Sequence, residues 1–303
     1  MYKLRDWITE EKLNIEMLCT NPHPAIIPIL ERHLDRIDQE YLSSNEYAMP
    51  LLEKHPDKIY WTTLSENPSA IHLLKRNRMK INGYHLGKNP NAISIIRDEL
   101  SKINPMFHDV WKGLHLNPNP EAVEILKTDP ANIDWFDFMT NPTAIDLLLN
   151  HLDHTRHTVE IVNLCLNPHP RAIEWIEQKL HLMWINWTNL TRNPGAVGLL
   201  EKYPHRIDWC NLFRNPNALS LIEKNMDQVS WYGLSLNPNA MHLLEKNQEK
   251  VNWSALSKNP AIFIYDYEAM YQRNAALKEE LMSVMFHPRN YGKFVSWGFD
   301  EFT

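Results

Sequence analysis

Glycine is scarce in this chain of 303 residues, with only eight copies. Because tight β-turns and phosphate-cradling loops depend on glycine, this scarcity disfavours a β-rich fold and a nucleotide-binding loop. The three cysteines, Cys19, Cys165 and Cys210, lie far apart and lack the paired spacing of a zinc site or a disulfide framework. We therefore expect free thiols in a reducing compartment.

The chain also lacks a long apolar run. No stretch approaches the roughly 20 apolar residues that span a bilayer, and the beginning, MYKLRDWITEEKLNIEML, mixes acids and bases where a secretion signal has an apolar core. Lys and Arg number 31 against 37 Asp and Glu, a formal charge of −6, which is the wrong sign for neutralising many phosphates. These absences predict a protein that is not secreted, does not bind membranes and has no general affinity for nucleic acid.

A short repeat fills most of the chain. Asn-Pro recurs in one register at ten positions and Asn45-Glu46 fits the same register, so there are eleven anchors, separated by 22 residues in five of ten intervals and by 24 to 28 in the others. The anchor asparagines are Asn21, Asn45, Asn67, Asn89, Asn117, Asn141, Asn167, Asn193, Asn215, Asn237 and Asn259. Since Asn favours a helix N-cap and Pro the first helical position, each anchor predicts the start of a helix, called helix A here.

A second helix start precedes a tryptophan in many copies. The predicted caps are Asp134, Asn186, Asp208, Ser230 and Asn252. Seven tryptophans lie six residues before an anchor asparagine: Trp61, Trp111, Trp135, Trp187, Trp209, Trp231 and Trp253. An Ile or Val before the cap and a Leu or Phe three residues after the Trp predict a helix B of about two turns, with the Trp packed between copies. A stacking platform for bases or sugars is the alternative for these rings.

Neither short helix is stable alone, so the copies must stack. The sequence predicts an all-α fold: an α-solenoid of about eleven two-helix repeats of about 22 residues, with a C-terminal helical cap. Residues 1–20 are the expected N-terminal capping segment, 21–262 the array, and 263–303 a helical cap whose apolar residues, Leu277 and Leu281 among them, cover the last repeat. The longest interval, 89–117, predicts a longer helix A and a longer loop after it, whereas the shifted Ala of the copies at 21, 117 and 167 predicts an extended entry to helix A.

The copies resemble the tandem-repeat proteins of large DNA viruses that infect amoebae and algae, whose units follow NPxAIxLLExNxxKIxWxxLS. RNPNALSLIEKNMDQVSWYGLSL is one such copy here, and the match runs from Asn21 to about Ile262. The end of the chain, with Tyr265-Asp266-Tyr267 and His287-Pro288-Arg289, is similar to the end of the same proteins. The resemblance implies a viral protein in the cytoplasm of an infected cell or in the virus particle, and it carries no activity.

Candidate chemistry is sparse. His151, His154 and His157 with Asp153 could offer metal ligands, but they do not share one helical face and no second cluster completes a site. No Walker loop, dinucleotide fingerprint, GxSxG or HExxH motif occurs. The array repeats its polar positions instead of singling out a few. We therefore predict a protein that is not an enzyme, with no catalytic residue, no cofactor and no metal.

The leading functional hypothesis is a scaffold that binds a protein or peptide partner. Solenoids expose variable polar positions on a rigid frame, and here the residues after the helix-B tryptophan vary between copies. The predicted partner-binding residues are Thr62, Thr63, Asn189, Tyr232 and Ser254. A structural component of a virus particle is a second form of the same hypothesis.

The alternative from another class is a helical repeat protein that binds nucleic acid. Basic residues recur directly before the helix-B Ile or Val, at Lys58, Lys80, Arg206 and Lys250. Other copies interrupt this row with Asn132, Trp184 and Gln228. Because a strand reader needs phosphate contacts in register, the interrupted row favours the protein-binding hypothesis.

Overall fold

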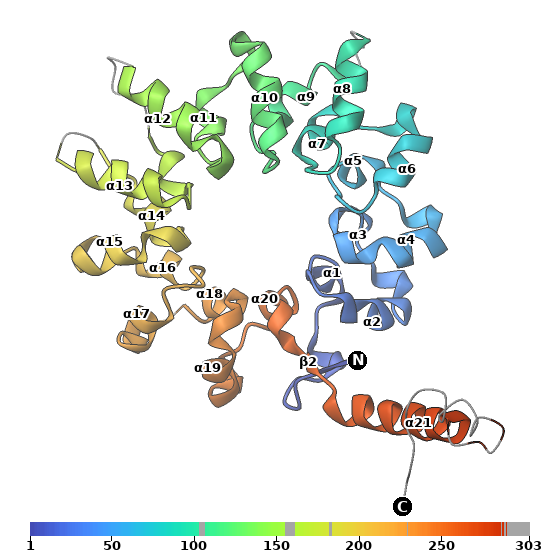
Figure 1. Cartoon of the computed structure of the whole chain (residues 1–303). Helices are drawn as coiled ribbons and strands as arrows, with labels where there is room; N and C mark the ends of the chain where they lie inside the picture. The colour runs from blue at the N-terminus through green and yellow to red at the C-terminus, as the bar shows by residue number, and fades with distance from the viewer. Residues whose placement is uncertain are drawn as a thin grey trace, which may run out of the picture. The chain divides into compact units, whose positions relative to one another are not determined.

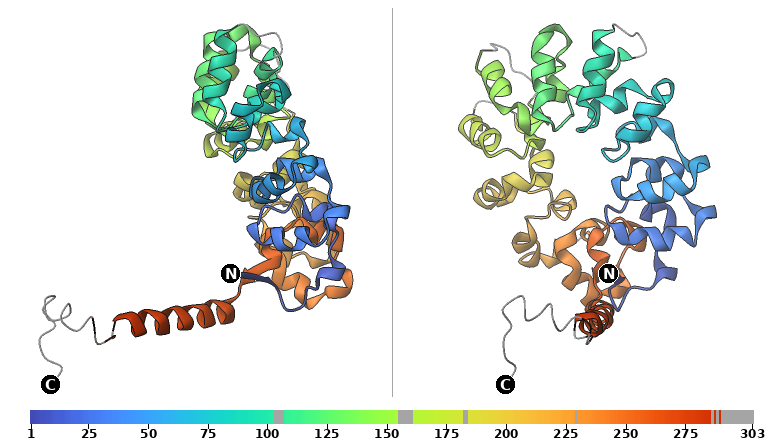
Figure 2. Two further views of the ribbon diagram at one scale, coloured as in Figure 1. Left: turned by 90° about the vertical axis from the view of Figure 1, so that its right-hand side faces the viewer. Right: turned by 45° about the vertical axis from the view of Figure 1, so that its right-hand side comes forward.

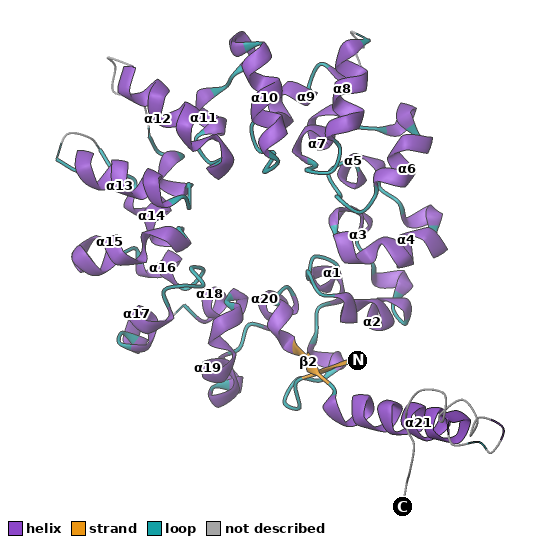
Figure 3. Ribbon diagram, viewed as in Figure 1, coloured by secondary structure: helices purple, strands orange, loops and turns teal. Residues whose placement is uncertain are grey.

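The computed structural model of the chain describes residues 1–102, 107–154, 161–181, 184–228, 230–285, 287 and 289. Two compact units are present, Trp7–Ile262 and a smaller unit that combines Met1–Asp6 with Phe263–Thr303. Helices dominate the described residues (Figure 3), so the expected all-α class is confirmed.

The smaller unit joins the two ends of the chain through a short strand pairing. β1 (Tyr2–Leu4) runs antiparallel to β2 (Phe263–Tyr265), and the rings of Tyr2 and Tyr265 stack with centroids 4.9 Å apart. The long helix α21 (Tyr267–Met285) follows. The carboxylate of Asp266 accepts from the backbone N–H of Ala269 (3.0 Å) and caps this helix.

The larger unit contains the repeat copies. Its helix A elements are α2 (Ile27–Glu31), α4 (Met49–Lys54), α6 (Ile71–Arg76), α8 (Ile93–Ser101), α10 (Pro120–Thr128), α12 (Ile145–His154), α13 (Pro170–Lys179), α15 (Val197–Lys202), α17 (Leu219–Glu223) and α19 (Met241–Lys246). Its helix B elements are α1 (Ile15–Leu18), α3 (Gln39–Ser44), α5 (Trp61–Leu64), α7 (Gly83–Lys88), α9 (Val110–Leu114), α11 (Trp135–Phe138), the 3-10 turn η10 (Leu164–Leu166), α14 (Trp187–Arg192), α16 (Trp209–Leu212), α18 (Trp231–Leu236) and α20 (Trp253–Ser257). Within this unit the copies follow one another around a ring, with helix B on the inner side and helix A on the outer side (Figure 1).

Side-chain caps start most of the helix B elements, and the anchor asparagines cap the short turns that lead into helix A. The Oδ1 of Asn193 accepts from the backbone N–H two residues on (2.9 Å), and the Oδ1 of Asn252 accepts from Ala255 (2.9 Å). Asp208 departs from this pattern, because its carboxylate accepts from the hydroxyl of Thr188 (2.9 Å) and the side-chain amide of Asn211 (3.0 Å) and caps no backbone N–H of its own helix.

The hydrophobic core lies between neighbouring copies. The Leu or Phe three residues after the tryptophan position is fully buried in Leu64, Phe138, Leu190, Leu212, Leu234 and Leu256. The small alanine near the start of helix A is equally buried, for example in Ala70 and Ala218. Burying such side chains contributes about 1.5–3 kcal/mol for each larger one, which stabilises helices that are too short to persist alone.

The first and last copies of the array contact each other. α1 packs against α20, and the Nδ2 of Asn21 donates to the backbone oxygens of Ser257 and Asn259, at 2.9 Å each. Within the larger unit the two ends of the array therefore cover each other. In the smaller unit the apolar side chains Leu277 and Leu281, for which the sequence predicts a role in a C-terminal cap, are exposed.

The longest interval, 89–117, carries a longer helix A, as predicted, because α8 spans nine residues. α10, α12 and α13 also span nine or ten residues, whereas α4, α6, α15 and α19 span six. α2 spans only five, although its anchor lies 24 residues before the next one. The additional residues therefore lie on the outer side of the larger unit, where helix A runs (Figure 2).

Candidate partner-binding site

A ladder of buried asparagine amides joins the copies and forms the frame of the site. The Nδ2 of each anchor asparagine donates to backbone oxygens of the preceding copy, as Asn215 does to Thr191 (3.1 Å) and Asn193 (2.8 Å). Its Oδ1 accepts from the backbone N–H of Asn217 (3.0 Å). Since a buried amide is stabilising only when its bonds are made, this ladder sets the spacing of the copies. The sequence indicated the cap but not the bonds of the amide nitrogen.

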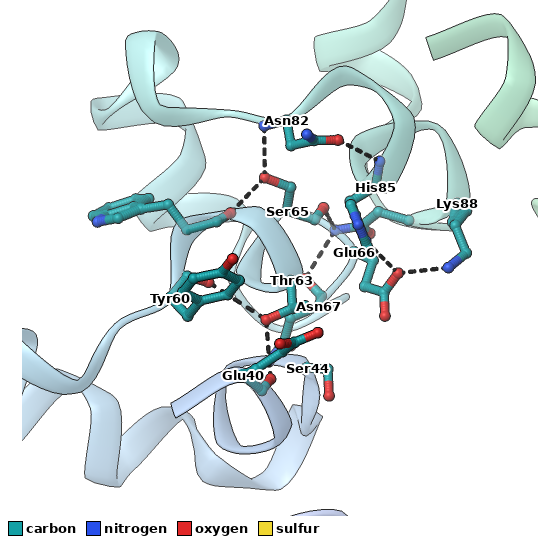
Figure 4. Close-up of polar contacts among 12 residues, drawn as sticks. Glu40, Ser44, Tyr60, Thr63, Ser65, Glu66, Asn67, Asn82, His85 and Lys88 are labelled. Atoms are coloured by element: carbon teal, nitrogen blue, oxygen red, sulfur yellow. Dashed lines mark hydrogen bonds and ion pairs between the residues drawn. The ribbon is translucent and has the colours of Figure 1, made fainter. Parts of the chain in front are cut away.

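A second row of bonds joins each helix B to the next. Ser65, two residues before an anchor, accepts in its hydroxyl the backbone N–H of Asn82 (3.0 Å), as Figure 4 shows. Ser257 accepts the backbone N–H of Asn14 (2.9 Å) in the same way across the closure of the array. The joint between the last and the first copy therefore repeats the bonds of an internal joint.

Cations lie over several tryptophan rings along one edge of the array. The pairs are Lys80 with Trp61 (4.5 Å), Arg206 with Trp187 (6.0 Å), Lys250 with Trp231 (5.0 Å) and Lys12 with Trp253 (4.7 Å), each measured to the ring centroid. All seven tryptophans of the repeat position are half-buried. The prediction that they are mostly buried is confirmed, although none is fully buried, because the first residue of helix B lies at the border of the core. A cation covers part of the ring in the pairs given above.

Not every copy has a cation at this position, and one copy that lacks it forms a pocket of about 590 Å³. In that copy Trp184 stands where other copies have Lys or Arg, and its side chain is 76% exposed. The walls are Leu180, Trp184, Ile185, Asn186, Trp187, Thr188, Tyr203, His205 and Arg206. Tyr203 packs against Trp187 with ring centroids 5.6 Å apart. The pocket thus combines aromatic faces with a guanidinium group.

This combination suits an apolar or aromatic side chain that is accompanied by a negative charge. Aromatic walls supply contact area at low conformational cost, and Trp, Tyr and Arg are the residues that dominate binding energy at protein interfaces. Arg206 is exposed beside the aromatic walls and can donate to a carboxylate. In the sequence Trp184 stands out only as an interruption of the basic row. A tryptophan at an otherwise polar repeat position is the feature that could have indicated a binding pocket here.

The five predicted contact residues differ in how far they are exposed to solvent. Tyr232 is 46% exposed, with the guanidinium carbon of Arg214 5.8 Å from its ring centroid. Ser254 is exposed and Thr62 is half-buried. These three occupy the position directly after the helix-B tryptophan. The exposed Thr188 of the pocket occupies the same position, so the pocket lies on the predicted row.

Thr63 and Asn189 do not face solvent as the predicted partner contact requires. Both side chains face a neighbouring copy. The hydroxyl of Thr63 is buried and donates to the backbone oxygen of Glu40 (2.9 Å), as Figure 4 shows. The Nδ2 of Asn189 donates to the backbone oxygen of Val162 (2.9 Å). Successive helical residues point about 100° apart, so when the first residue after the tryptophan faces solvent the second turns toward the adjoining copy.

The candidate metal ligands of the sequence are His151, His154 and His157, for which no metal site is expected. His151 stacks face to face on Trp135, with centroids 3.6 Å apart, and burial lowers its pKa. The side chains of His154 and His157 lie outside the described residues. Within the described part of the chain, no group of three or more His, Cys, Asp or Glu side chains is placed to hold a metal ion.

The cysteines differ in exposure. Burial raises the pKa of the Cys19 and Cys165 thiols to about 11, whereas Cys210 is exposed on the helix-B row. Two thiols are therefore held in the protonated, weakly nucleophilic form.

No helix among the described residues has the length and apolar character needed to cross a membrane. Comparisons of the chain with protein-family models, curated proteins and solved structures found no match.

Proposed function

We propose that this chain is a non-enzymatic repeat scaffold, an α-solenoid whose two ends meet, and that it binds a protein or peptide partner. The observation that carries the proposal is the pocket at Trp184, where this exposed side chain, the half-buried rings of Trp187 and Tyr203 and the exposed Arg206 form the walls. The partner segment would place a large apolar or aromatic side chain between Trp184 and Trp187 and an acidic residue beside Arg206. The viral origin and the location in an infected cell or a virus particle, which the repeat resemblance implies, belong to the same proposal.

The basic row supports protein binding over nucleic-acid binding. Lys80, Arg206 and Lys250 each lie over a tryptophan of the preceding copy. These pairs account for the recurrence of the cations without any phosphate contact. A strand reader would instead need cations that project from every copy, and Trp184 replaces one of them.

A displayed library of random peptides tests the pocket directly. We expect peptides selected on the full chain to share an aromatic or large aliphatic residue next to Asp or Glu. Trp184→Ala should weaken their binding at least about tenfold, because truncation of a central interface tryptophan commonly costs more than about 1.4 kcal/mol. Met79→Ala is the matched control, since Met79 is an apolar side chain that is 83% exposed elsewhere on the same unit.

The acidic residue of the peptide is assigned by a double-mutant cycle. Arg206→Ala and replacement of the peptide carboxylate by an amide should each weaken binding, and the combination should cost less than the sum of the two. Selection of no common peptide, or of peptides that bind the Trp184→Ala variant as tightly as the parent, would refute the proposal.

A further experiment tests how far the partner-binding surface extends along the helix-B row, which consists of the residues directly after each helix-B tryptophan. Joint replacement of Phe136, Tyr232 and Ser254 by Ala should weaken a longer partner segment that continues from the pocket, because all three are exposed. The control changes Ser69, His72 and His242, which are exposed on the helix A side. If only the control variant loses binding, the partner occupies the outer surface and the row is excluded.

A further inference from the structure

The helix α21 carries exposed apolar side chains in a heptad pattern. Leu277 is 52% exposed and Leu281 57% exposed, and Tyr267 and Val284 are exposed as well. Together with the half-buried Met270 they recur at alternating spacings of three and four residues, broken only by Asn274. In heptad terms Tyr267, Asn274 and Leu281 are a positions, and Met270, Leu277 and Val284 are d positions. Such spacing is the signature of helices that pair.

We propose that α21 is a self-association helix that pairs antiparallel with α21 of a second copy of this chain. In an antiparallel pair each a position faces a d position of the other helix. The register that aligns the two helices over their whole length sets Tyr267 against Val284, Met270 against Leu281 and Asn274 against Leu277. Every described apolar heptad side chain then meets another heptad side chain of the second copy.

The flanking charges favour this direction over the parallel one. In the antiparallel register the g position Arg273 lies beside Glu280 of the second copy, and symmetry repeats the pair. On the other flank Tyr271 lies beside Lys278 of the second copy, a cation–aromatic contact. A parallel pair would instead set Arg273 against Lys278 of the second copy, a repulsion that occurs twice.

Asn274 limits the strength of the pair. A polar side chain at an a position weakens a coiled coil while restricting its register. The helix spans only 19 residues, fewer than three heptads. We therefore expect a reversible dimer whose population rises with protein concentration, not an obligate one.

Sedimentation equilibrium of the full chain over a concentration series tests the proposal. The parent protein should show a monomer–dimer equilibrium, and the joint change Leu277→Glu with Leu281→Glu should leave only monomer. Circular dichroism checks that the rest of the fold is retained, because both changes are at exposed positions. A parent chain that stays monomeric throughout, or a dimer that persists in the double variant, would overturn the proposal.

Charge reversal tests the direction of pairing. Arg273→Glu alone and Glu280→Arg alone should each weaken dimerisation about tenfold. A mixture of the two variants should restore it, because both flanking pairs of the mixed dimer then join a carboxylate to a guanidinium group. Glu279→Arg, on the outward f position, is the matched control and should leave the equilibrium unchanged. In a parallel pair Arg273→Glu would instead strengthen dimerisation by meeting Lys278, and that result would overturn the antiparallel assignment.

Discussion

Copies of two kinds share the larger unit. Those anchored at Asn193, Asn215 and Asn237 recur every 22 residues with a helix A of five or six residues. Those anchored at Asn89 to Asn167 are longer, and their helix A has nine or ten residues. The asparagine ladder is nonetheless the same in both, since Asn141 donates to two backbone oxygens at 2.9 Å each.

The difference shows where this repeat tolerates added residues. The anchor asparagine keeps its bonds, and the outer helix A takes up much of the additional length, while the helix B of one long copy is the 3-10 turn η10. The Trp184 pocket lies where the last long copy meets the first regular one, in the connection between α13 and α14. A concave surface thus lies at the joint where the two kinds of copy meet.

The largest expected effect comes from breaking the ladder in either kind of copy. Asn215→Ala and Asn141→Ala should each destabilise the protein by about 3 kcal/mol, because each removes a helix cap and the bonds of two buried carbonyl groups. Equilibrium denaturation with urea measures both. Equal costs would support a common frame, whereas a cost confined to the regular copy would show that the long copies are held by other contacts.

Asn215→Asp adds a pH-dependent test of the same buried position. The carboxylate would face two carbonyl oxygens in a buried place, which raises its pKa in the folded state above the unfolded value. Stability contributed by the protonated form is then present at low pH and lost as the pH rises. The variant should therefore be least stable at neutral pH and should recover part of the loss below about pH 4.

A smaller loss of stability is expected where the last copy of the array meets the first. Asn21 donates to Ser257 and Asn259, but its Oδ1 makes no cap bond. Asn21→Ala should therefore cost about 2 kcal/mol, less than Asn215→Ala, since only the two amide bonds are lost. Urea denaturation of both variants gives the comparison. No loss at Asn21 would mean that the two ends of the array are apart in solution.

The smallest expected effect on stability comes from the charged cluster of Glu66, His85 and Lys88. Burial alone would raise the pKa of Glu66, but hydrogen bonds and charges from Lys88 (2.7 Å) and His85 (2.8 Å) outweigh it and lower the pKa below 4.5. Its contribution to stability is therefore present above pH 4.5 and lost as the pH falls through the lowered value. Glu66→Gln should lower stability at pH 7 by about 1 kcal/mol or less.

Thermal unfolding at several pH values checks this prediction. The difference between parent and Glu66→Gln should shrink as the pH falls below 4.5. Two of the long copies have Leu at the position of Glu66, as Leu116 and Leu166, so Leu116→Ala provides a control whose cost should not follow the titration of a carboxylate. A pH-independent difference at Glu66 would show that its ion pairs contribute nothing to stability.

Local features of the fold could be predicted from the sequence. Asn-Pro and the polar residue before each tryptophan mark helix starts because capping is decided within three residues. The apolar spacing identified the buried Leu and Ala positions, and the longest interval identified the long helix α8, because both depend on helical periodicity alone.

Features that depend on distant residues were decided by the tertiary structure. The partners of the Asn21 amide lie more than 230 residues away, and closure depends on small rotations added over every copy, which no single copy encodes. Thr63 and Asn189 look as variable as Thr62 and Tyr232 in the sequence, yet helical geometry turns them toward the adjoining copy. The Trp184 pocket likewise exists only because α13 and α14 bring Trp184 beside Tyr203 and Arg206, residues of the following copy.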